Sequence, residues 1–166
     1  MALLTSAIQT YSILATALAA GANLSTSVIT FPALLHAKPP VLTEQWHILY
    51  NTGITPVVGL AATGSAGFAT LAYRAAVAPG LSSLEGGLWT KRNLYIAAAA
   101  VTIGFAPYTR VVMWDTIQEL ERRARRGEAD DKENTRELVL RWGTLNLWRG
   151  VLLLTGAGLG MWASVV

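Results

Sequence analysis

Two polar side chains lie well inside the last apolar stretch of the chain, which continues to Val166. Trp142, Asn146 and Arg149 are spaced i, i+4, i+7, so they lie on one face of a helix. Arg149 stands about two helical turns inside a segment typical of a membrane span. A guanidinium there costs at least about 2.5 kcal/mol even on lenient insertion scales. Because that cost must be offset, the row predicts a site that uses a buried cation or a structural ion pair.

A second group of chemically capable side chains begins an earlier apolar stretch. His47, Tyr50 and Asn51 are spaced i, i+3, i+4, which lets all three point one way into a bundle. An imidazole can take and return protons near neutral pH. At about 1.5 Å per residue, Tyr50 and Asn51 counted inward from Glu44 reach the depth of Arg149. We therefore expect these groups to meet at one depth.

Other kinds of site have weak support. The chain has no cysteine, which excludes disulfides, thiolate nucleophiles and Cys-ligated metals. His36 and His47 flank Pro39-Pro40, a poor ligand pattern, so a metal is not favoured. No glycine-rich phosphate loop or GxSxG elbow occurs. The basic residues alternate with acidic ones and lack an aromatic platform, so no nucleic-acid partner is expected.

The composition shows which elements must position these groups. Of 166 residues, 52% are hydrophobic and only 14% charged, whereas a soluble domain carries about 25% charged residues. Most of the charge gathers between Asp115 and Glu137. This distribution predicts an all-α integral membrane four-helix bundle with one polar loop.

Proline, glycine and charge divide residues 1–166 into a single transmembrane domain. Pro39-Pro40 is expected to link the first two helices, with Thr43 as the N-cap of the second. The first 35 residues hold no Lys or Arg, which favours a retained helix over a signal peptide. The expected spans are about 6–31, 45–78, 89–114 and 136–164, with a charged loop at 115–135.

Lysine and arginine counts predict the orientation of the bundle. One side carries Lys38, Arg122, Arg123, Arg125, Arg126, Lys132 and Arg136, and the other carries Lys91 and Arg92 with Arg74 close by. The first side should therefore be cytosolic. We expect an integral membrane protein of the endoplasmic reticulum with the 115–135 loop in the cytosol. Arg110 and Asp115 would end the third span on that side.

Several motifs resemble one known family. The order QWHILYNTGITP, FAPYTRVVM, a charged loop, LVLRWGTLNLWRG and GAGLGMW is similar, over essentially the whole chain, to the anthrone oxygenases, small fungal membrane proteins. The most specific part is the W-x-x-L-N-x-x-R core in Trp142, Leu145, Asn146 and Arg149. The family often has P-T-N after a methionine in the third helix, whereas Trp114-Asp115 follows Met113 here.

The resemblance implies a reaction. Members act in aromatic polyketide pathways of secondary metabolism and oxidise an anthrone to an anthraquinone with O2. The expected enzyme is a monooxygenase-type oxidoreductase with O2 as co-substrate and no cofactor. Its partners would be a small hydrophobic aromatic polyketide and membrane lipid, with a homo-oligomer or polyketide-pathway enzymes as further partners to test. The alternative is a non-catalytic membrane assembly or scaffold protein in which Arg149 forms a structural buried pair.

The implied chemistry assigns roles to the predicted site residues. His47 would be the base, oriented by Asp115, while Arg149 with Asn146 would stabilise the enolate oxygen. Tyr50 would bind a phenol or protonate a peroxide. The remaining candidates for substrate binding are Trp46, Asn51, Trp142, Phe105, Tyr108 and Arg110.

Overall fold

The structure is a computed structural model that describes residues 2–77, 90–126 and 134–166. The described chain is helical almost throughout, which confirms the predicted all-α class. The link between the expected spans 45–78 and 89–114 lies outside the described residues, as do residues 127–133 of the charged loop expected at 115–135. The first part of that expected loop is helical as far as Arg126.

The helices follow one another in four limbs. The first limb is α1 (Ala2–Ser25), the π-helix η1 (Thr26–Thr30) and α2 (Phe31–Leu34), and the second is α3 (Pro39–Val77). The third is α4 (Lys91–Ile103), α5 (Phe105–Tyr108), the π-helix η2 (Thr109–Met113) and α6 (Trp114–Arg126). The fourth is α7 (Asn134–Val165).

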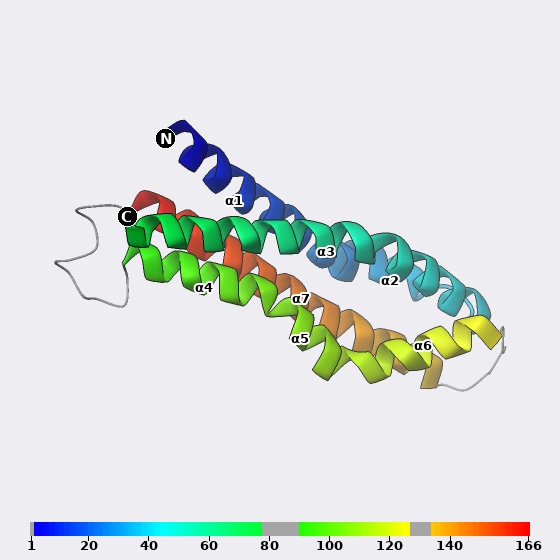
Figure 1. Cartoon of the computed structure of the whole chain (residues 1–166). Coiled ribbons are helices and arrows are strands. Elements are labelled where there is room, and N and C mark those ends of the chain that lie inside the picture. The colour runs from blue at the N-terminus through cyan, green and yellow to red at the C-terminus, as the bar shows by residue number, and fades with distance from the viewer. Residues whose placement is uncertain (1, 78–89, 127–133) are drawn as a thin grey trace.

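The four limbs lie along one another as a bundle (Figure 1). α1 packs against α3 and α7, and α4 packs against the same two helices. Both termini lie at one end of the bundle, and α6 extends the third limb to the opposite end. Within residues 2–77, 90–126 and 134–166, three helical segments are long and apolar enough to cross a membrane: Leu3–Leu34, Pro40–Val77 and Lys91–Arg126. The chain is thus a membrane four-helix bundle, in which α7 runs beside these segments and carries the polar residues Asn146 and Arg149.

Proline sets two boundaries differently from the sequence-based expectation. α3 begins at Pro39 rather than at Glu44, because proline is tolerated in a first turn, where its missing N–H has no helical partner. Thr43 is therefore inside the helix, and its hydroxyl donates to the Pro40 carbonyl at 3.0 Å. Pro107 cannot donate to the carbonyl four residues earlier, which accounts for the end of α4 at Ile103.

The described residues form three apolar core clusters. One surrounds Trp46, Met113 and Trp142 near α6, one surrounds Phe68 and Tyr95 near the termini, and a smaller one lies around Ala19, Val57, Ala61, Phe105 and Leu153. Asn23, Asn146 and Arg149 are also buried. Asn146 is four residues from Trp142 and Arg149 four from Leu153, so the polar group interrupts the core between two apolar clusters.

Glycines let the helices approach closely. A Cβ atom at Gly160 would overlap the Phe68 ring, and one at Gly156 would overlap the Thr102 hydroxyl. Gly158 lies between them, and its Cβ position is open. The GxxxG pattern at 156–160 therefore packs within the chain.

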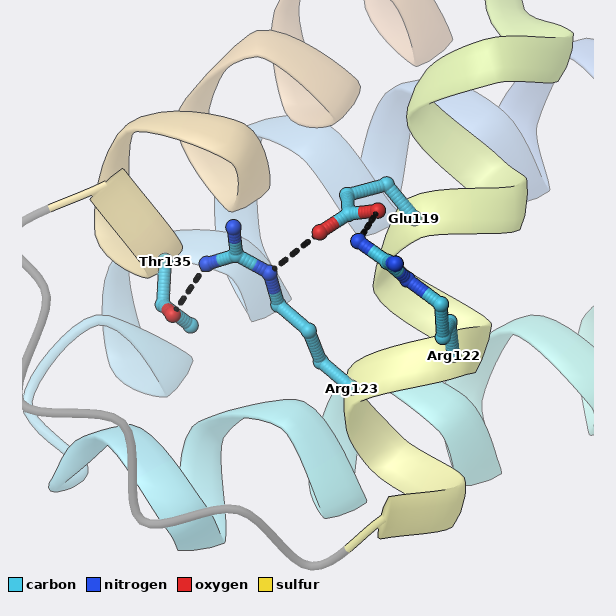
Figure 2. Close-up of polar contacts among 4 residues, drawn as sticks. All are labelled: Glu119, Arg122, Arg123 and Thr135. Atoms are coloured by element: carbon cyan, nitrogen blue, oxygen red, sulfur yellow. Dashed lines mark hydrogen bonds and ion pairs between the residues drawn. The ribbon is translucent and has the colours of Figure 1, made fainter.

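A polar clasp joins α6 to α7 (Figure 2). Arg123 Nε donates to Glu119 at 2.8 Å, and Arg123 Nη1 donates to the buried Thr135 hydroxyl at 2.7 Å. Arg122 binds the other oxygen of Glu119 but stays within α6. The clasp holds the charged end of the third limb against the start of the fourth.

Candidate functional site

The site is built on Arg149, whose side chain is only 4% exposed. Its Nε and Nη2 both donate to Asn23 Oδ1 in α1, at 2.9 Å and 2.6 Å. Nη2 also donates to Asn146 Oδ1, one turn earlier in α7, at 2.8 Å. Two amide oxygens thus hold the guanidinium from two helices.

Neighbouring groups orient both amides. Asn23 Nδ2 donates to the Ala19 carbonyl at 2.8 Å. Asn146 Nδ2 donates to the Asn23 carbonyl at 3.0 Å and to Ser27 Oγ at 2.9 Å. Ser27 belongs to η1, and such short π-helices are frequent at functional sites. Each amide therefore turns its oxygen toward Arg149.

The charge on Arg149 has no carboxylate partner within the described part of the chain. Its Nη1 is buried and makes no hydrogen bond there. A buried cation with an unpaired donor is costly, and such groups mark functional sites in membrane proteins. The geometry favours binding of an anion or of an oxygen that becomes negative during a reaction.

Arg149 lies on the wall of a cavity of about 120 Å³. The cavity is enclosed by α1, η1, α3 and α7, with Asn23, Tyr50, Trp142 and Asn146 among its lining residues. Most of the other lining residues are apolar: Ala22, Leu49, Gly53, Ile54, Pro56, Val57 and Leu60. Ala22 and Pro56 are exposed, so the cavity wall reaches the outer surface between α1 and α3, which in a membrane faces lipid.

Aromatic rings form the end of the cavity toward α6. Tyr50 stacks on Trp46 with ring centroids 5.3 Å apart, and Trp142 meets both rings edge-on at 6.4 Å and 5.7 Å. Trp46 is completely buried and lies outside the cavity lining. It therefore supports the two rings that form the wall.

The structure does not bring the predicted base and its partner together. His47 is partly buried, and its ring contacts the exposed Asn51 amide, with the ring nitrogens about 3 Å away. Neither residue lines the cavity. Asp115 is exposed because α6 turns Thr116, Ile117 and Leu120 to the core. No hydrogen bond or ion pair joins Asp115 to His47, although both are among the described residues.

Three predicted substrate contacts also lie elsewhere. Phe105 is buried in the middle apolar cluster, and the Tyr108 hydroxyl donates to the Leu145 carbonyl at 3.3 Å. Arg110 is exposed and lies over the Trp114 ring, 4.3 Å from its centroid. Within the described residues, no three His, Asp or Glu side chains gather as a group that could hold a metal ion.

Asn23 and Ser27 are the site residues that the sequence-based prediction missed. Both are polar positions in the second half of a spanning helix, four residues apart. That spacing puts them on one face. Polar groups in a span usually face a partner within the bundle, which is the signal that could have identified them.

Comparison with known proteins decides the family. The model of the anthrone oxygenase family matches residues 46–159, a stretch that includes Tyr50, Trp142, Asn146 and Arg149. The chain belongs to the anthrone oxygenase family. No solved structure matches it.

Curated anthrone oxygenases resemble the chain over most of its length. One from Claviceps purpurea is 34% identical over 149 residues, covering 84% of this chain and 78% of the relative. Anthrone oxygenase nsrD from Aspergillus novofumigatus is 31% identical over 166 residues, covering 95% of each. Monooxygenase hypC from Dothistroma septosporum is 30% identical, covering 85% of this chain and 74% of the relative. This membership supports an oxidoreductase of the oxygenase type.

Proposed function

We propose that this chain oxidises an anthrone-type aromatic polyketide to its anthraquinone with O2, in the cavity beside Arg149. The main support is the buried guanidinium, which is held by two amide oxygens and whose Nη1 has no hydrogen-bond partner among the described residues. An anthrone that loses a C10 proton becomes an enolate with its charge on the C9 oxygen. A fixed cation beside that oxygen stabilises the enolate more than the neutral ketone.

The enolate can react with O2 directly. One electron passes from the enolate to O2, and the resulting radical and superoxide combine to form a C10–O bond. The peroxide takes a proton. Loss of the second C10 proton then breaks the O–O bond, forms the C10 carbonyl and releases hydroxide, which becomes water. The balance is one anthrone and one O2 to one anthraquinone and one water, so no external reductant is required. This proposal assigns no cofactor.

The proton acceptor is assigned separately. Tyr50 lines the cavity, whereas His47 lies one turn earlier on α3 and outside the lining. We assign proton movement at the substrate to Tyr50, through its hydroxyl and water. His47 is assigned no contact with the substrate in this arrangement.

The cavity favours an apolar substrate that arrives from the bilayer. Pockets for drug-sized ligands have volumes of about 300 Å³ or more, so a three-ring substrate would fill the cavity and extend between α1 and α3. Ala22, Gly53 and Pro56 on this side are small or apolar. The surrounding apolar wall would keep bulk water from the enolate.

A scaffold role explains part of the arrangement. The bonds from Asn146 and Arg149 to Asn23 join α7 to α1, as a structural contact would. The expected carboxylate partner of Arg149 is not found among the described residues, and a packing role leaves the unpaired Nη1 and the adjoining cavity unexplained. These features favour the enzyme.

Location and orientation belong to the same proposal. We infer that the protein resides in the endoplasmic reticulum, with the charged end around α6 in the cytosol, from the lysine and arginine distribution. Glycosylation acceptor sites added separately at the two ends would test it, because only a lumenal site is modified. Glycosylation at the α6 end would show that this end is lumenal and would contradict the inferred orientation.

The direct test uses purified protein and emodin anthrone. Anthraquinone should form in air and not under nitrogen, at a rate unchanged by a metal chelator. Arg149→Met should lower the rate by about 100-fold or more at equal protein level, as removal of an oxyanion donor does. Equal rates with and without the protein, or an unimpaired Arg149→Met variant, would overturn the proposal.

A further inference from the structure

We propose that Asn23 is a positioning residue, which holds Arg149 through a neutral oxygen so that the full positive charge remains available to an anionic ligand in the cavity. The inference rests on the proposed function in taking that ligand to be the substrate enolate. Asn23 lies before residues 46–159, the stretch that the family model matches.

The first step is that the Asn23 amide has one orientation. Its Nδ2 donates to the Ala19 carbonyl at 2.8 Å, and a carbonyl can only accept. Its Oδ1 must then face Arg149, where it accepts from Nε and Nη2. The side chain is 2% exposed, so water does not compete for these bonds.

The second step is that the guanidinium is fixed on two edges. Asn146 repeats the arrangement from α7, because its Nδ2 donates to the Asn23 carbonyl and to Ser27 Oγ while its Oδ1 accepts from Nη2. Nε and Nη2 are thereby fully used. Nη1 is the remaining edge, and no group in the described part of the chain bonds it.

The third step concerns charge. An aspartate at position 23 could accept the same two bonds, but its negative charge would cancel that of Arg149. An opposite charge within about 4–6 Å shifts the pKa of an ionisable group by about one to three units. A guanidinium already paired with a carboxylate would therefore attract a second anion less strongly. Asparagine supplies the geometry of a carboxylate without its charge.

Asn23→Asp therefore tests the inference with little change in shape. The probe is 2-hydroxyanthraquinone, a three-ring phenol whose anion absorbs at longer wavelength than its neutral form. When the probe is bound to the wild-type protein in detergent, its acid dissociation constant should be at least about tenfold larger than in protein-free detergent. Bound to Asn23→Asp, it should lose most of that gain.

Two further variants control the measurement. Asn93→Asp makes the same chemical change at an exposed position in the first turn of α4 and should behave as wild type. Asn146→Asp places the carboxylate on the same Nη2 from the other helix. Asn146→Asp serves as the test if Asn23→Asp does not accumulate. It should also abolish the easier ionisation of the bound probe.

Turnover supplies the second measurement. With emodin anthrone, Asn23→Asp should lower kcat and move the pH profile of kcat to higher pH, because the enolate forms less readily. If Asn23 had only a structural role, the variant would lose stability but keep the wild-type pH profile. A wild-type protein that leaves the ionisation of the probe unchanged, or an Asn23→Asp variant that shifts it as wild type does, overturns the inference. A wild-type protein that shifts the ionisation but does not oxidise the anthrone supports the inference and refutes the proposed function.

Discussion

Asn23 Oδ1 accepts two hydrogen bonds from Arg149, at 2.9 Å from Nε and 2.6 Å from Nη2, across the interface between α1 and α7. Hydrogen bonds from a charged donor contribute about 1.5–3 kcal/mol each. With the bond to Asn146 they are together large enough to offset the cost of a cation in a membrane helix, about 2.5–3.5 kcal/mol on insertion scales. A neutral partner thus makes the buried arginine tolerable and leaves its charge uncancelled.

Gly160→Ala should destabilise the bundle. A Cβ at this position overlaps the Phe68 ring, and overpacking of this kind typically costs about 1–3 kcal/mol. Gly158→Ala is the matched control, because its Cβ meets no atom within 4 Å. Thermal unfolding in detergent should show a lower midpoint for Gly160→Ala alone. Equal midpoints would mean that α7 does not pack against Phe68 as described.

The clasp between α6 and α7 makes a second stability prediction. Arg123→Ala removes the bonds to Glu119 and to the buried Thr135, and should cost about 1 kcal/mol. Arg122→Ala removes one bond to the same carboxylate, from a side chain that is 55% exposed. It should therefore lower the free energy of unfolding by only about a few tenths of a kcal/mol. The same unfolding measurement compares the two. A larger loss for Arg122→Ala would contradict the clasp.

Residue spacing predicted the row on α7 but not its partner. Trp142, Asn146 and Arg149 all line the cavity, as their common helix face indicates. Asn23 was not assigned, because periodicity within one helix does not say which neighbouring helix it faces. The four-limb bundle was predictable from the long apolar segments. In lipid, the backbone N–H and C=O groups of such a segment must bond one another, which an α-helix allows.

The His47 prediction shows what residue spacing alone does not decide. Positions i, i+3 and i+4 share a broad helix face, but the face of α3 that lines the cavity includes Tyr50, Gly53 and Val57 and excludes His47 and Asn51. A difference of one residue turns a side chain by about 100° around the helix axis. Which part of that face meets the cavity depends on helix rotation, which is set by packing rather than by local sequence.

Arg149→Lys should lower kcat although it keeps the charge. An ammonium can donate to both amide oxygens, but it is a point charge on a flexible stem and lacks the planar fork that fixes the direction of the free guanidinium edge. We expect a loss of about tenfold to a hundredfold in kcat with emodin anthrone, at unchanged protein level. Wild-type turnover by the lysine variant would show that charge alone suffices.

Tyr50→Phe should reduce turnover more than His47→Gln. The Tyr50 side chain lines the cavity and carries a hydroxyl, whereas His47 bonds Asn51 outside it. Loss of a proton-transferring group typically costs about 10²–10⁴-fold. Steady-state kcat of the two variants with emodin anthrone makes the comparison. The reverse order would restore His47 as the base and would require a movement of α3 that brings its ring to the substrate.

Gly53→Leu should block the cavity without disturbing the fold. A Cβ at Gly53 meets no atom within 4 Å, and the residue lines the cavity, so a larger side chain can grow into the empty space. Replacing glycine inside a helix also favours folding, by up to about 1 kcal/mol. The variant should accumulate normally and unfold no earlier than wild type. Its turnover of emodin anthrone should fall at least tenfold, because the substrate and the leucine would occupy the same volume.

Gly59→Leu is the matched control for this experiment. Gly59 belongs to the same helix, its Cβ position is equally open, and it is exposed outside the cavity lining. Both variants add the same side chain to α3, so an effect on insertion or expression should appear in both. Only a reaction in this cavity makes Gly53→Leu inactive and Gly59→Leu active. If both turn over normally, the reaction takes place elsewhere in the protein, and Arg149 has the structural role.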